Sequence, residues 1–284
     1  GMMPPEASQQ HGETGSLADP SAPATSTPSE PVESTVPTAR HQLSAALVRT
    51  VTDGQPHGGL DVQSIAVDAD LADALGLGAQ RGALVTEASS SSARGAGLRV
   101  GDIIQKVHGS EVGGPNGVAH ALRDAKPETR VAVEVWRAGE GADDLKRLLI
   151  ERSDAGNVGA AASLGRLISL GRVFGPRNPT AALPYYLKAA EGGHLASMTR
   201  YALFAKDGIG MTKDEALAAR WFRKAAEGGQ EAAMTNLGNL YEAGRGVKQD
   251  DAEAARWYRR AADKGHVFAQ HRLALLHETG RGVE

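Results

Sequence analysis

Histidine, serine and carboxylate side chains are the groups of this chain that could do chemistry, because the chain contains no cysteine. His266, His271 and His277 lie within one stretch with a helical pattern. Their spacings of five and six residues do not bring three ligands to one helix face, so the sequence does not predict a metal site. The missing cysteine excludes disulfides, cysteine–zinc sites and cysteine nucleophiles, and it leaves the compartment open.

The serines and carboxylates do not form a catalytic pattern either. The run Ser89–Ser92 falls in a predicted loop and is typical of a linker. Gly113-Gly114-Pro115 resembles the end of the serine-protease motif, but Val112 stands where the nucleophilic serine would stand. Acidic residues are spread along the chain and indicate solvation rather than a general acid–base pair. We therefore predict a non-enzymatic protein without a cofactor.

Length and charge narrow the function classes further. The 284 residues allow roughly two domains of ~100–200 residues each. With 31 basic and 34 acidic residues the formal net charge is −3, so no nucleic-acid partner is predicted. No stretch approaches the ~18 consecutive apolar residues of a membrane span.

The C-terminal half of the chain repeats itself at a distance of 36 residues. AAEGGHLASM begins at Ala189, AAEGGQEAAM at Ala225 and AADKGHVFAQ at Ala261. Glycine pairs and aromatic pairs recur with the same step: Gly208 and Gly210, Gly244 and Gly246, Gly280 and Gly282; Tyr185-Tyr186, Trp221-Phe222 and Trp257-Tyr258. A period in the thirties with two helical runs per unit predicts an α-α solenoid, an architecture that holds partners.

The unit Gly229–Asp263 resembles a Sel-one-like repeat, a relative of the tetratricopeptide repeat. We place units near 158–193, 194–229 and 230–265, with a half unit at 266–284, inside a repeat region of 153–284. Trp221 and Trp257 are predicted to be largely buried between helices, and Gly244 and Gly246 to end a first helix. The first unit is degenerate, with Arg172 and Phe174 where later units have glycines. The half unit suggests either that the chain is cut from a longer protein or that it ends on an unusual half-repeat. His194 and His266, which share one repeat position with Gln230, are predicted to be solvated turn residues.

The N-terminal segment 1–57 is predicted to be a disordered tail or linker. Residues 1–40 hold 18 Ser, Thr or Pro residues and no apolar period. Such a segment cannot bury enough surface to offset its ordering entropy. The charged start and apolar core of a signal peptide are missing, but a signal or anchor could have been removed, so their absence says little about location.

Residues 58–152 have the pattern of a small mixed sheet with helices. Runs that suit strands are Leu60–Ile65, Ala83–Glu87, Ile103–Val107, Val131–Trp136 and Leu148–Ile150. Helical candidates are Ala69–Leu75, Ala93–Leu98 and Val118–Ala125.

Five blocks of this region resemble a PDZ domain of the bacterial HtrA type. They are Arg81-Gly-Ala-Leu-Val-Thr-Glu, Ala96-Gly-Leu-Arg-Val-Gly-Asp-Ile-Ile, Val107-His-Gly, Ala121-Leu-Arg-Asp-Ala and Pro127. The resemblance implies a small β-sandwich or barrel with two helices, so the whole chain is expected to be multidomain, α+β followed by all-α.

The same resemblance implies a peptide-binding groove between one strand and one helix. A ligand would add as an extra strand, with its terminal carboxylate held by backbone N–H groups of a loop. The implied site residues come from the loop and strand and from the groove helix: Leu60, Asp61, Val62, Gln63 and Ile65; Pro115, Val118, Ala119 and Leu122. The small and apolar residues of the helix favour a ligand with an apolar terminal residue.

Asp61 departs from the family pattern, which usually has glycine between the two apolar loop residues. Aspartate tolerates a positive φ better than most residues, but it adds a negative charge near a ligand carboxylate. At ~5 Å and an effective dielectric of ~20 the repulsion would be ~3 kcal/mol, and less if the side chain faces water. Two interpretations stay open: weakened capture of peptide ends or internal segments instead, and a solvent-facing Asp61 with little effect.

The sequence therefore indicates a protein–protein interaction adaptor or scaffold, with a groove for extended or C-terminal peptides and repeats for a second protein. The alternative is the regulatory C-terminal part of an HtrA-like envelope serine protease whose catalytic domain lies outside this chain. A third interpretation treats the groove as vestigial and the domain as a spacer. The resemblance favours the bacterial cell envelope or periplasm over the cytoplasm, and the identity of the partner and the oligomeric state stay open.

Overall fold

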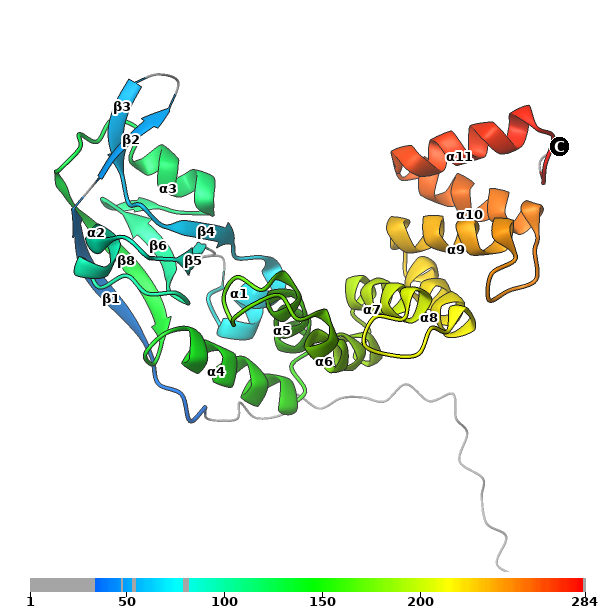
Figure 1. Cartoon of the computed structure of the whole chain (residues 1–284), viewed down its shortest axis with the longest axis horizontal. Helices are drawn as coiled ribbons and strands as arrows, with labels where there is room; N and C mark the ends of the chain where they lie inside the picture. Colours follow the sequence, from blue (N-terminus) through cyan, green and yellow to red (C-terminus); the bar gives the residue numbers. More distant parts are fainter. Residues whose placement is uncertain (1–33, 47, 53–54, 79–81, 283–284) are drawn as a thin grey trace, which may run out of the picture. The chain divides into compact units, whose positions relative to one another are not determined.

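The computed structural model describes residues 34–46, 48–52, 55–78 and 82–282, and these described residues form one compact unit. Figure 1 shows the order of their helices and strands. The tail predicted for residues 1–33 lies outside the described residues. Within the described part, an antiparallel sheet with short helices is followed by pairs of longer helices.

The sheet has the strand order β1-β8-β6-β5-β4, with β7 paired to β6. Its strands are β1 (Thr38–Ala46), β4 (Gln63–Ala66), β5 (Ala83–Glu87), β6 (Ile103–Val107), β7 (Ser110–Glu111) and β8 (Arg130–Ala138). Val131, Val133 and Val135 alternate inward along β8, the period expected of a strand with one buried face. A separate hairpin pairs β2 (Val48–Thr52) with β3 (Gln55–Gly59).

Four helices accompany the strands: α1 (Ala69–Leu75), α2 (Ser91–Gly95), α3 (Pro115–Ala121) and α4 (Ala142–Asp154). Asp68 and Ser90 begin α1 and α2, because their side-chain oxygens accept hydrogen bonds from the amides of Leu71 and Ala93. The predicted elements β5, β6 and α1 have the bounds found in the structure, and α2 and α3 begin two and three residues before the predicted starts.

Two sequence predictions about the sheet region are wrong. β1 lies inside the predicted tail and pairs with β8 along its whole length, from Thr38 opposite Ala138 to Ala46 opposite Arg130. The folded region therefore begins before residue 58; its first strand was missed because its partner lies about 90 residues further along the chain, beyond any local pattern. The segment Leu148–Ile150 is not a strand but part of α4, where Leu145, Leu148 and Leu149 are fully buried at helical spacing.

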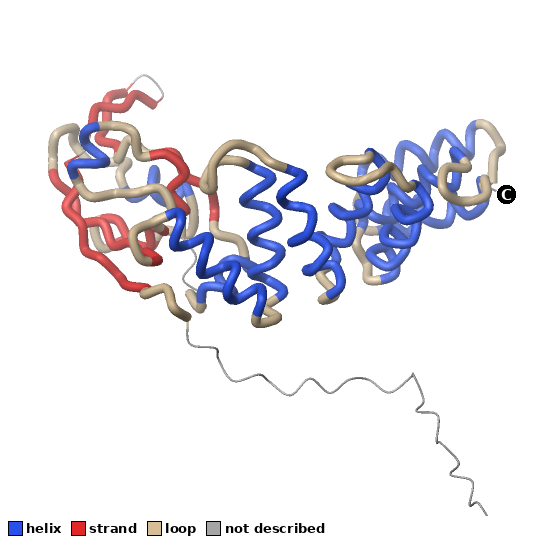
Figure 2. Tube along the Cα trace, turned by 60° about the horizontal axis from the view of Figure 1, so that its bottom comes forward, coloured by secondary structure: helices blue, strands red, loops and turns tan. Residues whose placement is uncertain are grey.

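The repeat region consists of α5 (Val158–Leu170), α6 (Pro179–Glu191), α7 (Leu195–Asp207), α8 (Glu215–Glu227), α9 (Glu231–Ala243), α10 (Asp251–Asp263) and α11 (Val267–Glu278). Each helix packs against the helices before and after it in the chain (Figure 2). Helices of 12 or 13 residues are marginal alone, so packing between neighbours must supply the stability.

The two glycines of each repeated pair have different physical reasons. Gly244 ends α9 with φ of 63°, and its amide bonds back to the helix carbonyls, as expected of a left-handed cap. Gly246 also has a positive φ, of 68°, and a Cβ atom there would lie 2.2 Å from the carbonyl of Glu215 in the preceding unit. The second glycine therefore allows the loop of one unit to contact the second helix of the unit before it.

A further glycine makes room for the buried aromatic ring. A Cβ atom on Gly238 of α9 would lie 2.7 Å from the ring of Tyr258, and the same relation holds between Gly165 and Tyr186, at 2.9 Å. Tyr258 and Phe222 are fully buried, whereas Trp257 is 8% exposed and Trp221 only partly buried. Burial of Trp257 is thus confirmed, but the deepest ring of each pair is the second aromatic, and Trp221 lies nearer the surface than predicted.

The first unit is less degenerate than the sequence suggested. Gly171, not position 172 or 174, ends α5 with φ of 69°. The segment between this cap and the next helix is one residue longer than in the later units, since α6 begins at Pro179 and α8 at Glu215. A fixed period of 36 therefore missed the capping glycine by one position.

His194 and His266 are helix N-caps and not merely solvated turn residues. Nδ1 of His194 accepts a hydrogen bond from the amide of Ser197, at 3.2 Å, and its Nε2 lies 3.1 Å from Asp70 of α1. Nδ1 of His266 lies 3.1 Å from the hydroxyl of Thr235 in the previous unit.

The sheet region and the first repeats share one hydrophobic core. Leu71 of α1, Leu148 of α4 and Leu164 of α5 are fully buried in the same cluster. Around this core an ion pair joins Asp68 to Arg166, at 2.8 Å. Because apolar burial couples the two regions, we expect them to behave as one cooperative unit at this junction.

Replacing Gly246 by alanine is expected to lower the free energy of unfolding by about 1–3 kcal/mol, because the new Cβ would overlap the backbone of Glu215. Gly265→Ala is the matched control, since Gly265 has φ of 89° but nothing within 4 Å of its Cβ position. Urea unfolding of both variants measures the difference. Equal losses would show that only the left-handed backbone matters and that the contact between units does not.

Candidate functional site

The predicted groove lies at the edge of the sheet, where β4 is the last strand and has β5 as its partner among the described strands. Ile65 of β4 pairs with Leu84, and α3 contacts both β4 and β5 (Figure 1). At its start α3 comes close to β4, because a Cβ atom on Gly114 would lie 3.5 Å from that of Ala66. The structure thus brings together the strand and the helix that the sequence assigned to one site.

The predicted loop before β4 has the conformation that glycine would favour. Asp61 adopts φ of 49°, in the left-handed region, and its side chain is exposed. Leu60 on one side is buried, and Val62 on the other is partly buried against the same core. The backbone therefore turns at Asp61 while its two apolar neighbours anchor the loop.

The nine predicted site residues divide into two groups. Leu60, Val118 and Leu122 are buried together in one hydrophobic core, and Val62 packs against it. The side chains nearer to solvent are Asp61, Gln63 and Ala119, which are exposed, and Ile65 and Pro115, which are partly buried. Leu122, the predicted pocket floor, is only 3% exposed and belongs to this core.

A second site, which the sequence did not predict, lies among the repeats. It is a pocket of about 590 Å³ formed by α7, α9, α11 and the segments after α9 and α11. Its lining residues are Lys206, Asn236, Asn239, Leu240, Glu242, Ala243, Arg245, Phe268, Arg272 and Arg281. Four of these side chains are basic and one is acidic, and Phe268 is 49% exposed.

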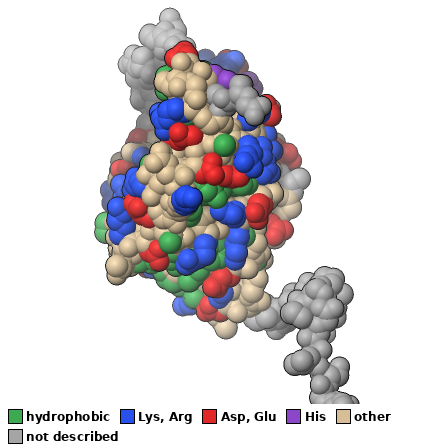
Figure 3. All heavy atoms as spheres, turned by 90° about the vertical axis from the view of Figure 1, so that its right-hand side faces the viewer, with side chains coloured by type: hydrophobic (Ala, Val, Ile, Leu, Met, Phe, Trp, Pro, Cys, Tyr) green, Lys and Arg blue, Asp and Glu red, His purple; other side chains and the backbone are tan. Residues whose placement is uncertain are grey.

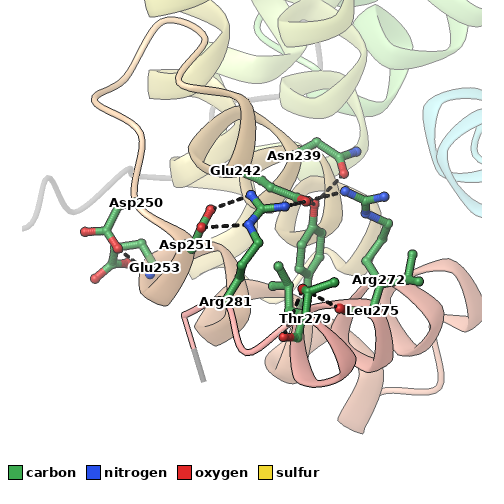
Figure 4. Close-up of polar contacts among 11 residues, drawn as sticks. Asn239, Glu242, Asp250, Asp251, Glu253, Arg272, Leu275, Thr279 and Arg281 are labelled. Carbon is green, nitrogen blue, oxygen red and sulfur yellow. Dashed lines mark hydrogen bonds and ion pairs between the residues drawn. The ribbon is translucent and has the colours of Figure 1, made fainter. Parts of the chain in front are cut away.

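Glu242 of α9 is the centre of the polar contacts in this pocket (Figure 4). Its carboxylate accepts hydrogen bonds from the hydroxyl of Tyr258, at 2.9 Å, and from Arg272. Arg281 reaches its other oxygen at 3.5 Å. The hydrogen bond that Arg272 donates to Glu242 raises the pKa of Arg272, and burial, followed by the hydrogen bond to Glu242, raises the pKa of Tyr258. Glu242 therefore holds α10 and α11 to α9.

Two arginines of the pocket occupy the same position in successive units. Arg245 pairs with Glu215 through Nε, at 2.9 Å, and Arg281 pairs with Asp251 through Nε and NH2, at 3.0 and 2.9 Å. Hydrogen bonds from Arg245 and then Lys213 lower the pKa of Glu215 to about 2. The recurrence of arginine 36 residues apart was the one signal in the sequence that could have identified this surface.

The described residues give no sign of a metal centre or a membrane helix. Within residues 34–282, as far as they are described, no group of three His, Asp or Glu side chains could hold a metal ion. In the same part of the chain no helix has the length and apolar character needed to cross a membrane.

Comparison with known proteins finds partial similarity to periplasmic endoproteases. The chain is 31% identical over 83 residues to a probable periplasmic serine endoprotease DegP-like of Bartonella henselae, covering 29% of this chain and 16% of that protein. The corresponding protein of Rhizobium meliloti is 34% identical over 84 residues, covering 29% and 17%. The chain thus spans about a sixth of the length of these curated relatives.

Two solved structures resemble the chain in part. A protective antigen of uropathogenic Escherichia coli strains, described as displaying an SLR fold, matches 51% of this chain and 31% of its own at 28% identity, with a TM-score of 0.48. A Sel1 repeat protein from Oxalobacter formigenes matches 46% of this chain and 53% of its own at 34% identity, with a TM-score of 0.43.

The family model of the Sel1 repeat matches residues 158–194, 195–230, 231–266 and 267–284. These bounds agree within one residue with the units predicted from the 36-residue period, and each match begins at a first helix of a pair or its cap. Sel1 repeats generally mediate protein–protein interaction and are typically non-enzymatic. The part of this chain from residue 158 to residue 284 is therefore an array of Sel1 repeats.

Proposed function

We propose that this protein is a non-enzymatic adaptor in which a PDZ-like sheet domain binds an extended peptide while the Sel1 repeats bind a second protein. The observation that carries the first part is the position of β4 at the end of the strand order, beside α3. An added strand would pair with the free edge of β4, with alternate side chains pointing towards α3. The left-handed turn at Asp61 supports a loop that presents backbone amides to a terminal carboxylate.

The alternative function is regulation of an envelope serine protease. The partial similarity to periplasmic DegP-like endoproteases favours it, and it would require a catalytic domain outside this chain. The same similarity supports a location in the bacterial cell envelope under either function. A protease sequence directly upstream in the complete gene would favour the alternative, and its absence there would favour the adaptor.

A peptide that ends in an apolar residue with a free carboxylate is expected to bind the chain, and amidation of its terminus is expected to weaken binding by ~1.5–3 kcal/mol. Asp61→Gly is expected to tighten binding of the free acid about tenfold, or ~1.4 kcal/mol, because it relaxes the loop and removes a like charge. Fluorescence anisotropy with labelled peptides measures the affinity of the original chain and of Asp61→Gly for both the free-acid and the amidated peptide.

The matched control for this substitution is Glu128→Gly, since Glu128 is exposed and has a φ of 64° but follows α3 and lies outside the loop before β4. Ala119→Glu tests whether α3 forms one side of the peptide-binding groove. Ala119 is chosen because its side chain is exposed, whereas a charge at buried Leu122 would disrupt the core. Equal binding of free and amidated peptides by both the original chain and Asp61→Gly would contradict capture of a peptide end.

A further inference from the structure

We propose that the pocket between α9 and α11 binds an extended segment of a partner protein that carries aspartate or glutamate side chains next to a large apolar residue. This inference rests on the proposed function of the repeats as the second binding surface, and it specifies the chemistry of their partner. It starts from the lining of the pocket, which contains four basic side chains, those of Lys206, Arg245, Arg272 and Arg281, and one acidic side chain, that of Glu242. Arg272 and Arg281 contact Glu242, whereas Lys206 pairs with Asp207, at 3.2 Å, outside the lining.

The acids that hold these cations contact them from one side. Arg245 donates hydrogen bonds from Nε and Nη2 to Glu215, and Arg281 donates hydrogen bonds from Nε and Nη2 to Asp251. The remaining nitrogen of Arg281 reaches Glu242 only at 3.5 Å, and that of Arg245 makes no hydrogen bond within the described part of the chain. Each guanidinium is thus fixed in orientation and keeps N–H donors for another acceptor.

Arg272 has the least satisfied donors of the group. It donates from NH2 to Glu242, while its buried Nε has no hydrogen-bond partner among the described residues. The Arg272 side chain is 30% exposed, so a ligand in the pocket would meet its terminal N–H groups and not the buried Nε. Carboxylates fit a guanidinium because both are planar and can form two parallel hydrogen bonds.

The spacing of the cations favours several acidic side chains over one terminal carboxylate. Lys206 comes from α7, Arg245 follows α9, and Arg281 follows α11, so the donors are distributed over three successive units. An extended segment can place a carboxylate at each of these positions, whereas a peptide end supplies one terminal carboxylate. The wider surface at this end of the molecule mixes basic and acidic side chains, so directed hydrogen bonds and not net charge would select the ligand (Figure 3).

Phe268 supplies the apolar part of the recognition. Its ring lines the same pocket as Arg272, four residues further along α11, and is 49% exposed. The earlier units have Ala196 and Ala232 at this position, so only this unit offers a large ring to a ligand. Aromatic and arginine side chains are both enriched at protein–protein interfaces, so their presence in one pocket favours a protein ligand.

The test is selection of internal nine-residue peptides from a random display library on the whole chain carrying Ala119→Glu, a substitution intended to block the proposed sheet groove. The enriched peptides are expected to contain an excess of Asp and Glu next to Leu, Ile, Met or aromatic residues. Synthetic copies capped at both ends should bind at least tenfold more weakly when their acids are replaced by Gln or Asn. Neutral or basic consensus peptides, or no enrichment at all, would overturn the inference.

Variants locate the binding in the pocket. Arg272→Gln and Phe268→Ser are each expected to weaken binding of the capped peptides at least tenfold. Arg256→Gln is the matched control, because Arg256 is an exposed arginine of α10 that pairs with Glu253 and does not line the pocket. Phe268→Ser removes an exposed side chain, so it tests the pocket even if Arg272→Gln disturbs folding, which thermal melting by circular dichroism would reveal.

The outcomes separate this inference from the proposed function. Acidic peptides that bind equally to the original chain, Arg272→Gln and Phe268→Ser would show that the repeats bind partners through another face, and the adaptor function would stand without this pocket. Stronger binding of a single-stranded oligonucleotide than of every selected peptide, lost in Arg272→Gln, would replace the acidic segment by a nucleic acid and overturn the inference.

Discussion

Replacing Tyr258 by alanine is expected to lower the free energy of unfolding by about 3–5 kcal/mol, the range for removing a fully buried aromatic side chain. The ring fills the space that Gly238 leaves open on α9. Its hydroxyl donates a hydrogen bond to Asn239, at 2.6 Å, and to Glu242, at 2.9 Å. The variant therefore loses packing between α9 and α10 and also the contact that connects α10 to the carboxylate of the pocket.

Two further variants separate these contributions. Tyr258→Phe keeps the ring and removes the hydroxyl, so a loss of about 1 kcal/mol is expected. Trp221→Ala removes a larger but only partly buried side chain of the preceding unit, and its effect is expected to be smaller than that of Tyr258→Ala. Denaturant unfolding measures all three, and a loss below ~1 kcal/mol for Tyr258→Ala would contradict the packing of α9 on α10.

Removing the carboxylate of Asp102 is expected to destabilise the sheet region by about 3–5 kcal/mol, because it leaves Arg137 buried without its counter-charge. The side chains of Asp102 and Arg137 are 0% and 7% exposed. Arg137 donates from Nε to Oδ1, at 2.5 Å, and from NH2 to Oδ2, at 2.6 Å, and the bonds to Asp102 raise the pKa of Arg137. Asp102 also accepts a hydrogen bond from the backbone amide of Arg99, at 2.9 Å. The Asp102–Arg137 pair therefore joins β8 to the turn before β6.

A double-variant cycle tests whether the loss comes from the unpaired charge. Asp102→Leu combined with Arg137→Met replaces both members by apolar side chains and is expected to cost less than Asp102→Leu alone. Urea unfolding followed by circular dichroism measures the free energy of unfolding of the original chain, both single variants and the double variant. Additive losses in the cycle would show that the two side chains do not stabilise each other.

Much of the repeat region could be predicted from the sequence because its information is local and repeated. The 36-residue period gave the units, and helix caps such as Gly244 are specified by residues within one turn. The insertion after Gly171 was missed because it breaks the period by one residue. The choice between Trp257 and Tyr258 as the deepest ring was also missed, since residues adjacent on a helix differ in burial only through the neighbouring helix.

For the sheet region, the sequence predicted elements such as β5 and α1 but not their complete set. β1 was invisible because its stability comes from pairing with β8, far along the chain, and a segment of α4 was taken for a strand because three apolar residues do not define a period. The candidate groove was placed by resemblance alone, and the burial of Leu122 depends on how α3 and the segment after it pack on the core.

The sequence by itself thus determined what is encoded in short stretches: a helical-repeat array, its unit bounds and most of the strands and helices before it. Tertiary structure alone decided which side chains meet across elements. It joined α1 and α4 to α5 in one core, and it brought Glu242, Arg272 and Arg281 to one pocket from two helices and a loop. The physical reason is that local patterns follow backbone geometry, whereas contacts between distant segments follow from packing and the satisfaction of buried polar groups.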